Sequence, residues 1–360
     1  MRFHPELIRR QFERGVVVLS IDTEQIWGYA DLMTEAQYLS RFPDALQAHE
    51  KLLARLCAAR IPATWFVVGG MLLKHSAGSR DHRMAGLPAD WIAKFPSGSE
   101  TTLPLWYRES FIEHLRMAGT TQEIGLHGGL THFIWTDRRA TEAVVHWELA
   151  EGVRALRAAH VLPNSFSFGR NEEAFYELLP PQGICSYRGR SPALAWQLGP
   201  TMAGAIVRIL DELLRTAPPP VWPHETLPGL WNIPSSSFFY PIASARARIV
   251  GLRSRVERFS RGLEAAARCK GIFHFSLHPE NLVESSHGFP LLDEMLERLI
   301  PMRDFGDIEV LTMSDIVARM ERNRENPLSA SAVEIRPATV YRKPLIQAGQ
   351  PVFEQSLEKQ

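Results

Sequence analysis

Residues 16–24 read VVVLSIDTE, a β-branched apolar run of strand length that ends abruptly in acidic side chains. Such a run predicts a buried strand over 16–21, followed by a loop that begins at Asp22. Similar patterns predict strands at 63–68, 123–127, 165–168, 184–187 and 272–277, and helices at 43–56, 138–156, 172–179 and 291–300. Strands that alternate with helices indicate right-handed βα units and a parallel sheet, either open or closed into a barrel.

The composition is that of a globular protein with one large core or two smaller ones, because 45 % of the 360 residues are hydrophobic and 22 % are charged. Forty basic residues balance forty acidic ones, so the chain has no overall charge that would attract nucleic acid. We therefore expect no nucleic-acid partner. The three cysteines lie far apart and predict neither a disulfide framework nor a structural zinc site. The charged first 15 residues and the lack of a long apolar stretch lead us to expect a cytoplasmic location.

Two stretches interrupt the alternation of strands and helices. Residues 70–118 mix Gly, Pro, Ser and charged side chains and are expected to run over the surface, and a second insert covers about 190–262. We therefore expect one catalytic domain over residues 1–322, with these two inserts, and a polar C-terminal tail over 323–360.

Polar side chains follow several predicted strands, at the position where parallel α/β folds place their active sites. In SIDTE, Asp22 and Glu24 are two residues apart and point the same way if the strand geometry continues. HGGLTH supplies His127 and His132, and two histidines with one carboxylate are a common ligand set for a catalytic divalent metal. The alternatives are solvated loop acids and a hydrogen-bonded interior histidine.

Two further strand ends carry candidate catalytic side chains. Arg170 follows the strand in SFSFGRN, where an arginine can bind a catalytic carboxylate and keep it ionised, although a plain surface arginine fits equally well. His278 ends FHFSLH and precedes Pro279, and it is either a general acid or a core histidine. His274 lies within the same strand and is expected to be structural.

In this order, the motifs resemble the polysaccharide deacetylase family, the NodB-like esterases of carbohydrate esterase family 4, over about residues 15–320. The resemblance is carried by SIDTE, EIGLHGGLTH, FGRN, GLWNIPSS and FSLHPENL. It implies a distorted (β/α) barrel of about seven parallel strands with inserted loops and helices. It also implies a metal-dependent hydrolase that removes an N-acetyl group from an amino sugar of a polysaccharide or a carrier-linked glycan precursor.

The resemblance further assigns a role to each matching residue. Asp22 would be the general base, His278 the general acid and Arg170 the residue that orients Asp22. The metal, zinc in the first place and otherwise cobalt, nickel or manganese, would be held by Glu24, His127 and His132. Trp231 and Asn171 would contact the substrate.

Two alternatives to a sugar deacetylase remain open: an amidohydrolase of a small non-sugar amide on the same fold, and an inactive carbohydrate-binding homologue. Tryptophans near the predicted loops favour a sugar, because aromatic faces suit pyranose rings, but they fit a core equally well. Residues 243–270 carry eight basic and two acidic side chains, and the apolar residues of this segment recur at helical spacing. This segment is either the solvated face of an amphipathic helix or a contact for phosphate or for the inner face of a membrane.

Overall fold

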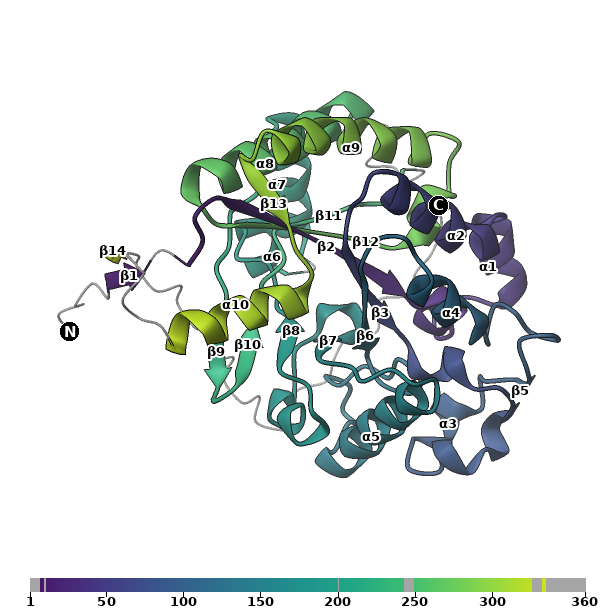
Figure 1. The fold of residues 1–360 in the computed structure, drawn as a ribbon. Helices are drawn as coiled ribbons and strands as arrows, with labels where there is room; N and C mark the ends of the chain where they lie inside the picture. The colour runs from purple at the N-terminus through teal and green to yellow at the C-terminus, as the bar shows by residue number, and fades with distance from the viewer. Residues whose placement is uncertain (1–6, 10, 200, 243–248, 326–331, 335–360) are drawn as a thin grey trace.

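The computed structural model describes residues 7–9, 11–199, 201–242, 249–325 and 332–334 and shows a mixed α/β fold, with helices packed around a central sheet (Figure 1). The strands are β1 (Leu7–Arg9), β2 (Gly15–Thr23), β3 (Ala63–Val67), β4 (Ser76–Ala77), β5 (Ser97–Gly98), β6 (Gln122–His127), β7 (Ser165–Ser167), β8 (Ser186–Arg188), β9 (His224–Leu227), β10 (Leu230–Asn232), β11 (Ser237–Phe238), β12 (Ile272–Leu277), β13 (Ile308–Val310) and β14 (Ala332–Glu334). The helices are α1 (Glu35–Arg41), α2 (Ala45–Ala58), α3 (Ala89–Ile92), α4 (Ser110–Arg116), α5 (Glu142–Ala158), α6 (Leu194–Gln197), α7 (Met202–Leu213), α8 (Leu252–Cys269), α9 (Gly288–Asp304) and α10 (Met313–Glu325).

The central sheet has the strand order β11-β12-β2-β3-β6-β7-β8-β10-β9, and β13 pairs with the start of β2. All of its pairs are parallel except β9 with β10. The segment 230–238 connects β8 on one side of the sheet with β12 on the other. Trp231 N donates to Cys185 O beside β8, and Ser236 N donates to His274 O on β12, both at 2.8 Å. The sheet thus curves into a distorted barrel, as expected.

Burial explains why these segments form strands and helices. Every residue of β2 is buried, as in a parallel strand covered on both faces. The long helix α5 begins at Thr141, whose side chain accepts a hydrogen bond from Val144 N, and it buries Val145, Leu149 and Leu156 on one side. No helix in the described ranges is long and apolar enough to cross a membrane.

Some expectations about the elements were wrong. Of residues 172–179, only 176–178 form a short 3-10 turn and no α-helix forms, because Phe175 has a left-handed φ of 50° and Pro180 begins the next turn. The sequence also did not predict the strands β9, β10, β11 and β13. Each is too short to show the alternation of apolar and polar residues that is typical of a strand. Helix α10 continues to Glu325, and residues 326–331 and 335–360 of the expected tail lie outside the described residues.

The first insert is packed more firmly than the sequence indicated. Within residues 70–118, β4 pairs with β5, and buried rings of Phe95, Trp106 and Tyr107 surround Trp27. Trp27 also donates from Nε1 to Trp106 O at 2.6 Å. The insert therefore covers the 3-10 turn η1 (Gln25–Tyr29), which follows Glu24 directly.

Candidate metal centre and active site

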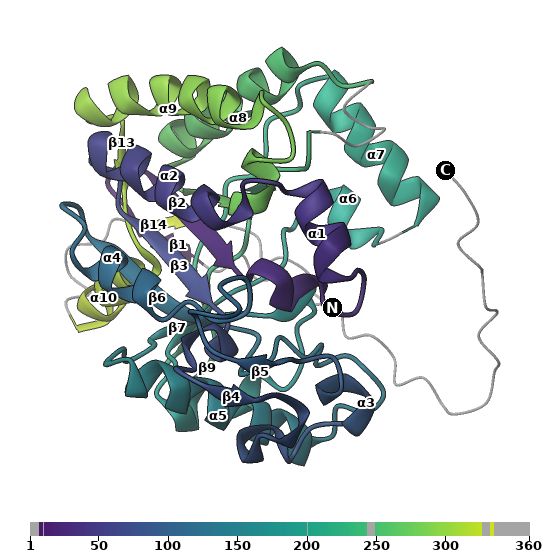
Figure 2. The same cartoon turned by 90° about the vertical axis from the view of Figure 1, so that its right-hand side faces the viewer.

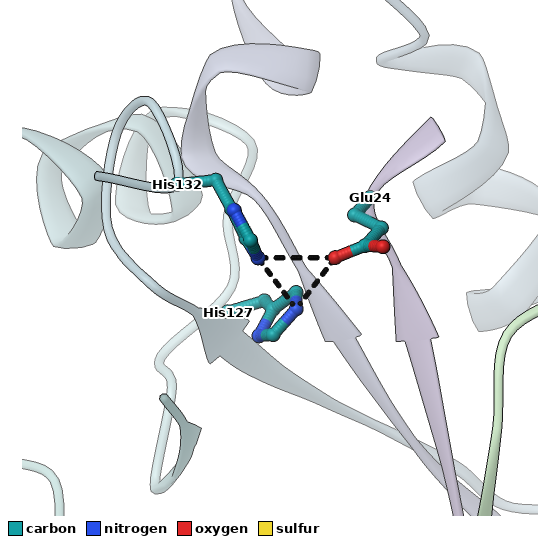
Figure 3. A group of neighbouring side chains, drawn as sticks. All are labelled: Glu24, His127 and His132. Carbon is teal, nitrogen blue, oxygen red and sulfur yellow. Dashed lines mark hydrogen bonds and ion pairs between the residues drawn. The ribbon is translucent and has the colours of Figure 1, made fainter. Parts of the chain in front are cut away.

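Three side chains from separate parts of the barrel point toward one another (Figure 3). Glu24 Oε2 lies 3.0 Å from His127 Nε2 and 3.0 Å from His132 Nε2, and the two imidazole nitrogens are 3.2 Å apart. All three side chains are buried. The structure thus brings together the three residues expected to hold a metal.

The backbone after β6 explains how histidines five positions apart meet. Gly128 has a φ of 69°, Gly129 a φ of 150° and His132 a φ of 63°, so the chain doubles back directly after His127. These left-handed conformations favour glycine at the first two positions. The loop replaces the helical geometry that would place the two histidines on different faces.

Helix α5 holds this loop in place through Glu148. The carboxylate of Glu148 accepts hydrogen bonds from the backbone N–H groups of Thr131 at 2.8 Å and Phe133 at 3.1 Å, on either side of His132. Gly152 packs directly on Gly129, since a Cβ on Gly152 would lie 2.6 Å from Gly129 C. The position of the second histidine is therefore fixed from the helix behind it.

The surroundings of both histidines favour metal binding. His127 Nδ1 lies 3.0 Å from the carbonyl oxygen of Ser167, which can only accept, so Nδ1 donates this hydrogen bond and Nε2 is the nitrogen turned toward Glu24 and His132. Burial lowers the pKa of His132 and keeps its ring neutral.

The donor set and its spacing fit a divalent cation. Two imidazole nitrogens and one carboxylate oxygen suit zinc and similar metals. Atoms bonded to one such ion at about 2.0–2.2 Å lie roughly 3.0–3.5 Å apart, which is the separation found among Glu24, His127 and His132. These three ligand atoms lie close enough together for one cation to contact all of them, so the residues present fit the group.

Asp22 lies beside this centre and is bound by Arg188. Arg188 Nη1 donates to Asp22 Oδ1 at 2.8 Å and Nη2 donates to Oδ2 at 2.7 Å, with both side chains almost fully buried. Burial by itself would raise the pKa of Asp22, but the Arg188 guanidinium and the neighbouring His127 and His278 lower it well below its usual range. Asp22 is therefore held as a carboxylate.

Arg170, the residue expected to orient Asp22, makes a different contact. Its Nη2 donates to Asp31 Oδ1 at 2.5 Å and Oδ2 at 2.6 Å, and its side chain is 39 % exposed. The expectation was wrong because Arg170 has a φ of 52°, and its side chain reaches Asp31 instead of Asp22. Asn171, expected at the substrate, instead accepts from Arg188 Nε at 3.2 Å and Nη2 at 3.0 Å.

His278 completes the cluster from the end of β12. Its Nε2 lies 3.2 Å from Asp22 Oδ2 and its Nδ1 lies 3.0 Å from Glu24 Oε1. Burial alone would lower the pKa of His278, but the carboxylates of Glu24 and Asp22 raise it well above its ordinary value. The side chain is 20 % exposed, whereas Asp22, Glu24, His127 and His132 are each 4 % exposed or less. It is therefore the most accessible of the five.

Trp231 does not line this centre. Its Nε1 donates to Glu321 Oε1 of α10 at 2.8 Å, and Arg324 lies over its ring. The ring belongs to a core cluster with Phe12 and Ile316. The expectation failed because β10 turns this side chain toward α10, and three residues are too few to reveal that register from the sequence.

A buried carboxyl, Glu280, lies behind the centre on the 3-10 turn η9 (Pro279–Leu282). It accepts from Tyr38 Oη at 3.1 Å, and His49 Nε2 is 4.0 Å away. Burial raises the pKa of Glu280 to about 7 and lowers that of His49 to about 3. His274, also fully buried, has its pKa lowered to about 3 by burial and lies 2.9 Å from Ser20 Oγ, as suits the structural role expected.

Sequence reasoning missed two residues that shape the site. Arg188 directly follows the strand expected at 184–187, so its place at a strand end was a usable signal. Glu148 gave no such signal, because it lies within a helix whose polar positions are normally solvated.

Comparison with solved structures decides the fold. The chain superposes on a candidate polysaccharide deacetylase from Mycobacterium smegmatis with a TM-score of 0.56 and 18 % identity, over 92 % of this chain and 94 % of that one. A probable polysaccharide deacetylase from Pseudomonas aeruginosa PAO1 gives a TM-score of 0.53 and 12 % identity, over 87 % and 92 %. The chain has the polysaccharide deacetylase fold. This confirms the fold expected from the resemblance.

A solved structure whose name gives a different activity is also similar to this chain. PuuE allantoinase gives a TM-score of 0.52 and 13 % identity, over 87 % of this chain and 91 % of that one. No protein-family model matches the chain, and no curated protein does. A deacetylase or amidohydrolase fold is thus shown, while the substrate has to be argued from the site.

Proposed function

We propose that the protein is a metal-dependent hydrolase that removes an N-acetyl group from an amino sugar of a polysaccharide or a carrier-linked glycan precursor. One observation carries the proposal: Asp22 and His278 lie in contact beside the cluster of Glu24, His127 and His132. Amide hydrolysis needs a base for water, stabilisation of the oxyanion and a proton for the leaving nitrogen.

The residues of the cluster can meet these needs. Glu24, His127 and His132 would hold the metal, which when bound acidifies water and polarises a carbonyl. Asp22, kept ionised by Arg188, would accept the proton of the attacking water. His278, whose raised pKa keeps the imidazole protonated, would give its own proton to the departing nitrogen, and the 3.2 Å between Asp22 Oδ2 and His278 Nε2 would then allow the proton taken from water to replace it.

Variants at the two proton-transfer residues test this proposal. Asp22→Asn and His278→Ala should each lower acetate release by about 10² to 10⁴, the usual cost of removing a general base or acid. Metal content by elemental analysis should stay near that of the wild type, because neither side chain is among the three ligands. Near wild-type turnover in either variant would refute these roles.

The preference for a sugar over a small amide comes from the resemblance alone. Trp27 and Trp135 are buried in the core, so these rings give no support for a sugar-binding surface. The fold shared with an allantoinase keeps a small non-sugar amide as the second candidate. A panel of N-acetylated sugars and small amides, with acetate or ammonia release as the readout, separates the two.

Zinc is the metal we propose, with cobalt, nickel and manganese as alternatives that the same ligands accept. Elemental analysis of the purified protein identifies it. A protein that takes up no metal would support an inactive carbohydrate-binding homologue instead. We also propose a cytoplasmic location, which cell fractionation tests.

A further inference from the structure

Helix α7 presents a row of large apolar side chains to solvent. Met202, Ile206, Leu210, Leu213 and the adjoining Leu214 recur at intervals of three or four residues, and each is between 42 % and 82 % exposed. These five residues are here called the α7 stripe. Residues at this spacing lie on one face of a helix. A helix at the surface of a globular protein normally turns such a face toward the core.

The opposite side of α7 carries the polar residues that face the protein. Glu212 is 3 % exposed, and Arg208 Nη1 donates to the carbonyl oxygens of Ala195 and Gly199 on the neighbouring α6 segment. Thr201 caps the helix by accepting from Gly204 N at 3.1 Å. Because its polar side is already packed, α7 cannot bury the stripe by turning over.

Basic side chains gather at the C-terminal end of the α7 stripe. Arg261 of α8 donates to the carbonyl oxygens of Leu214 and Arg215, and both Arg215 and Arg253 pair with a single acid, Glu257. Arg253 is 86 % exposed.

We propose that the α7 stripe docks the protein on the surface of an anionic lipid bilayer. A helix whose apolar side chains point outward and are flanked by arginines matches the two parts of such a surface, the acyl chains and the phosphate head groups. The helix lies at the periphery of the molecule, as docking requires (Figure 2). A second copy of the chain would cover the stripe, but with forty basic and forty acidic residues it would offer no overall negative charge to Arg215 and Arg253.

The protein-facing side of helix α7, opposite the stripe, is close to the candidate active site. Arg208 and Asp211 of α7 line a small cavity together with Phe238 and Tyr240, and the ring of Phe238 packs edge-on against His278 at 5.2 Å between centroids. One layer of side chains thus separates α7 from the most accessible residue of the centre. Taken with the proposed function, on which this one point rests, the arrangement favours an amino sugar presented at a membrane surface.

Vesicle co-sedimentation of the purified full chain tests the docking. The wild type should bind vesicles of phosphatidylcholine with one quarter phosphatidylglycerol and should bind pure phosphatidylcholine far more weakly. The double variant Ile206→Ser with Leu210→Ser should lose at least about tenfold in affinity, because two inserted apolar side chains are removed. Arg253→Glu should weaken binding to the anionic vesicles by about fivefold or more. Met117→Ser with Leu162→Ser is the matched control, since these apolar residues are 82 % and 74 % exposed and lie elsewhere.

Three outcomes would overturn the docking: a wild type that stays in the supernatant with both vesicles, a stripe variant that binds as well as the wild type, or a control variant that loses as much. A stripe variant that converts a dimer into a monomer in light scattering, without any vesicle binding by the wild type, would assign the stripe to a second copy. Acetate release from a soluble N-acetylated sugar separates this test from the proposed function. It should be unchanged in the stripe variant, and absent hydrolysis with retained vesicle binding would refute only the proposed function.

Discussion

Replacing Arg188 by methionine tests which arginine supports Asp22. The substitution keeps much of the side-chain volume but removes two charge-assisted hydrogen bonds, at 2.8 Å and 2.7 Å, from a carboxylate that is 2 % exposed. Hydrogen bonds to charged groups contribute about 1.5–3 kcal/mol each, and breaking a buried ion pair costs about 3–5 kcal/mol. We therefore expect the free energy of unfolding to fall by about 3–5 kcal/mol.

Activity should fall as well, by about 10² to 10⁴ in kcat/KM, because Asp22 would no longer be held as an oriented carboxylate. Arg170→Met is the matched control: its partner Asp31 is partly exposed, so the loss should be about 0–1 kcal/mol of stability. Urea unfolding and acetate release measure both effects. Adding Asp22→Asn to Arg188→Met should recover part of the stability, since it removes the unpaired charge.

The reasoning would be refuted if Arg170→Met abolished activity while Arg188→Met left stability and turnover unchanged. That result would mean that the resemblance-based assignment of Arg170 describes the working enzyme, and that the contact between Arg188 and Asp22 does not.

Three more predictions concern the centre and its surroundings. Gly28→Ala should weaken metal binding at least about tenfold by calorimetry, because its Cβ would lie 2.2 Å from Glu24 Cδ, whereas Gly119→Ala, with no atom within 4 Å, should change nothing. His127→Ala should purify with little metal by elemental analysis, and full occupancy would show that the ion lies elsewhere. Because burial raises the pKa of Glu280 to about 7, the folded protein retains a proton that the unfolded chain releases near 4.5, so stability should fall as the pH rises between these values. In urea unfolding at pH 5 and pH 8, Glu280→Gln should reduce the difference in the free energy of unfolding between the two pH values by up to about 3 kcal/mol. An equal difference in the wild type and the variant would contradict this prediction.

The sequence predicted the site residues best where they lie at the carboxyl end of a parallel strand. The strands β2, β6 and β12 each span six or more residues, and their carboxyl ends meet at one end of the barrel. Glu24, His127 and His278 were therefore found by position alone, before any contact was known. Their distances had to come from the structure.

The errors arose where single backbone angles decide the direction of a side chain. Arg170 follows β7 and Arg188 is the last residue of the adjacent strand β8, so both fit an arginine at a strand end. The left-handed φ of 52° at Arg170 and the contact of Asn171 with Arg188 are tertiary features that no residue pattern announces. Trp231 failed for a related reason, since a one-residue change of register moves a strand side chain to the opposite face.

The register of the barrel has a consequence for synthesis on the ribosome. Strand β2, which ends in the acidic residues of the centre, pairs with β12 so that Val16 lies opposite Ile272. At about 5–20 residues per second, translation delivers β12 roughly 10–50 s after β2. One edge of this long, fully buried strand must wait that long for its partner, so early chain stalling or loss of chaperone cover should expose an aggregation-prone template at the N-terminal end.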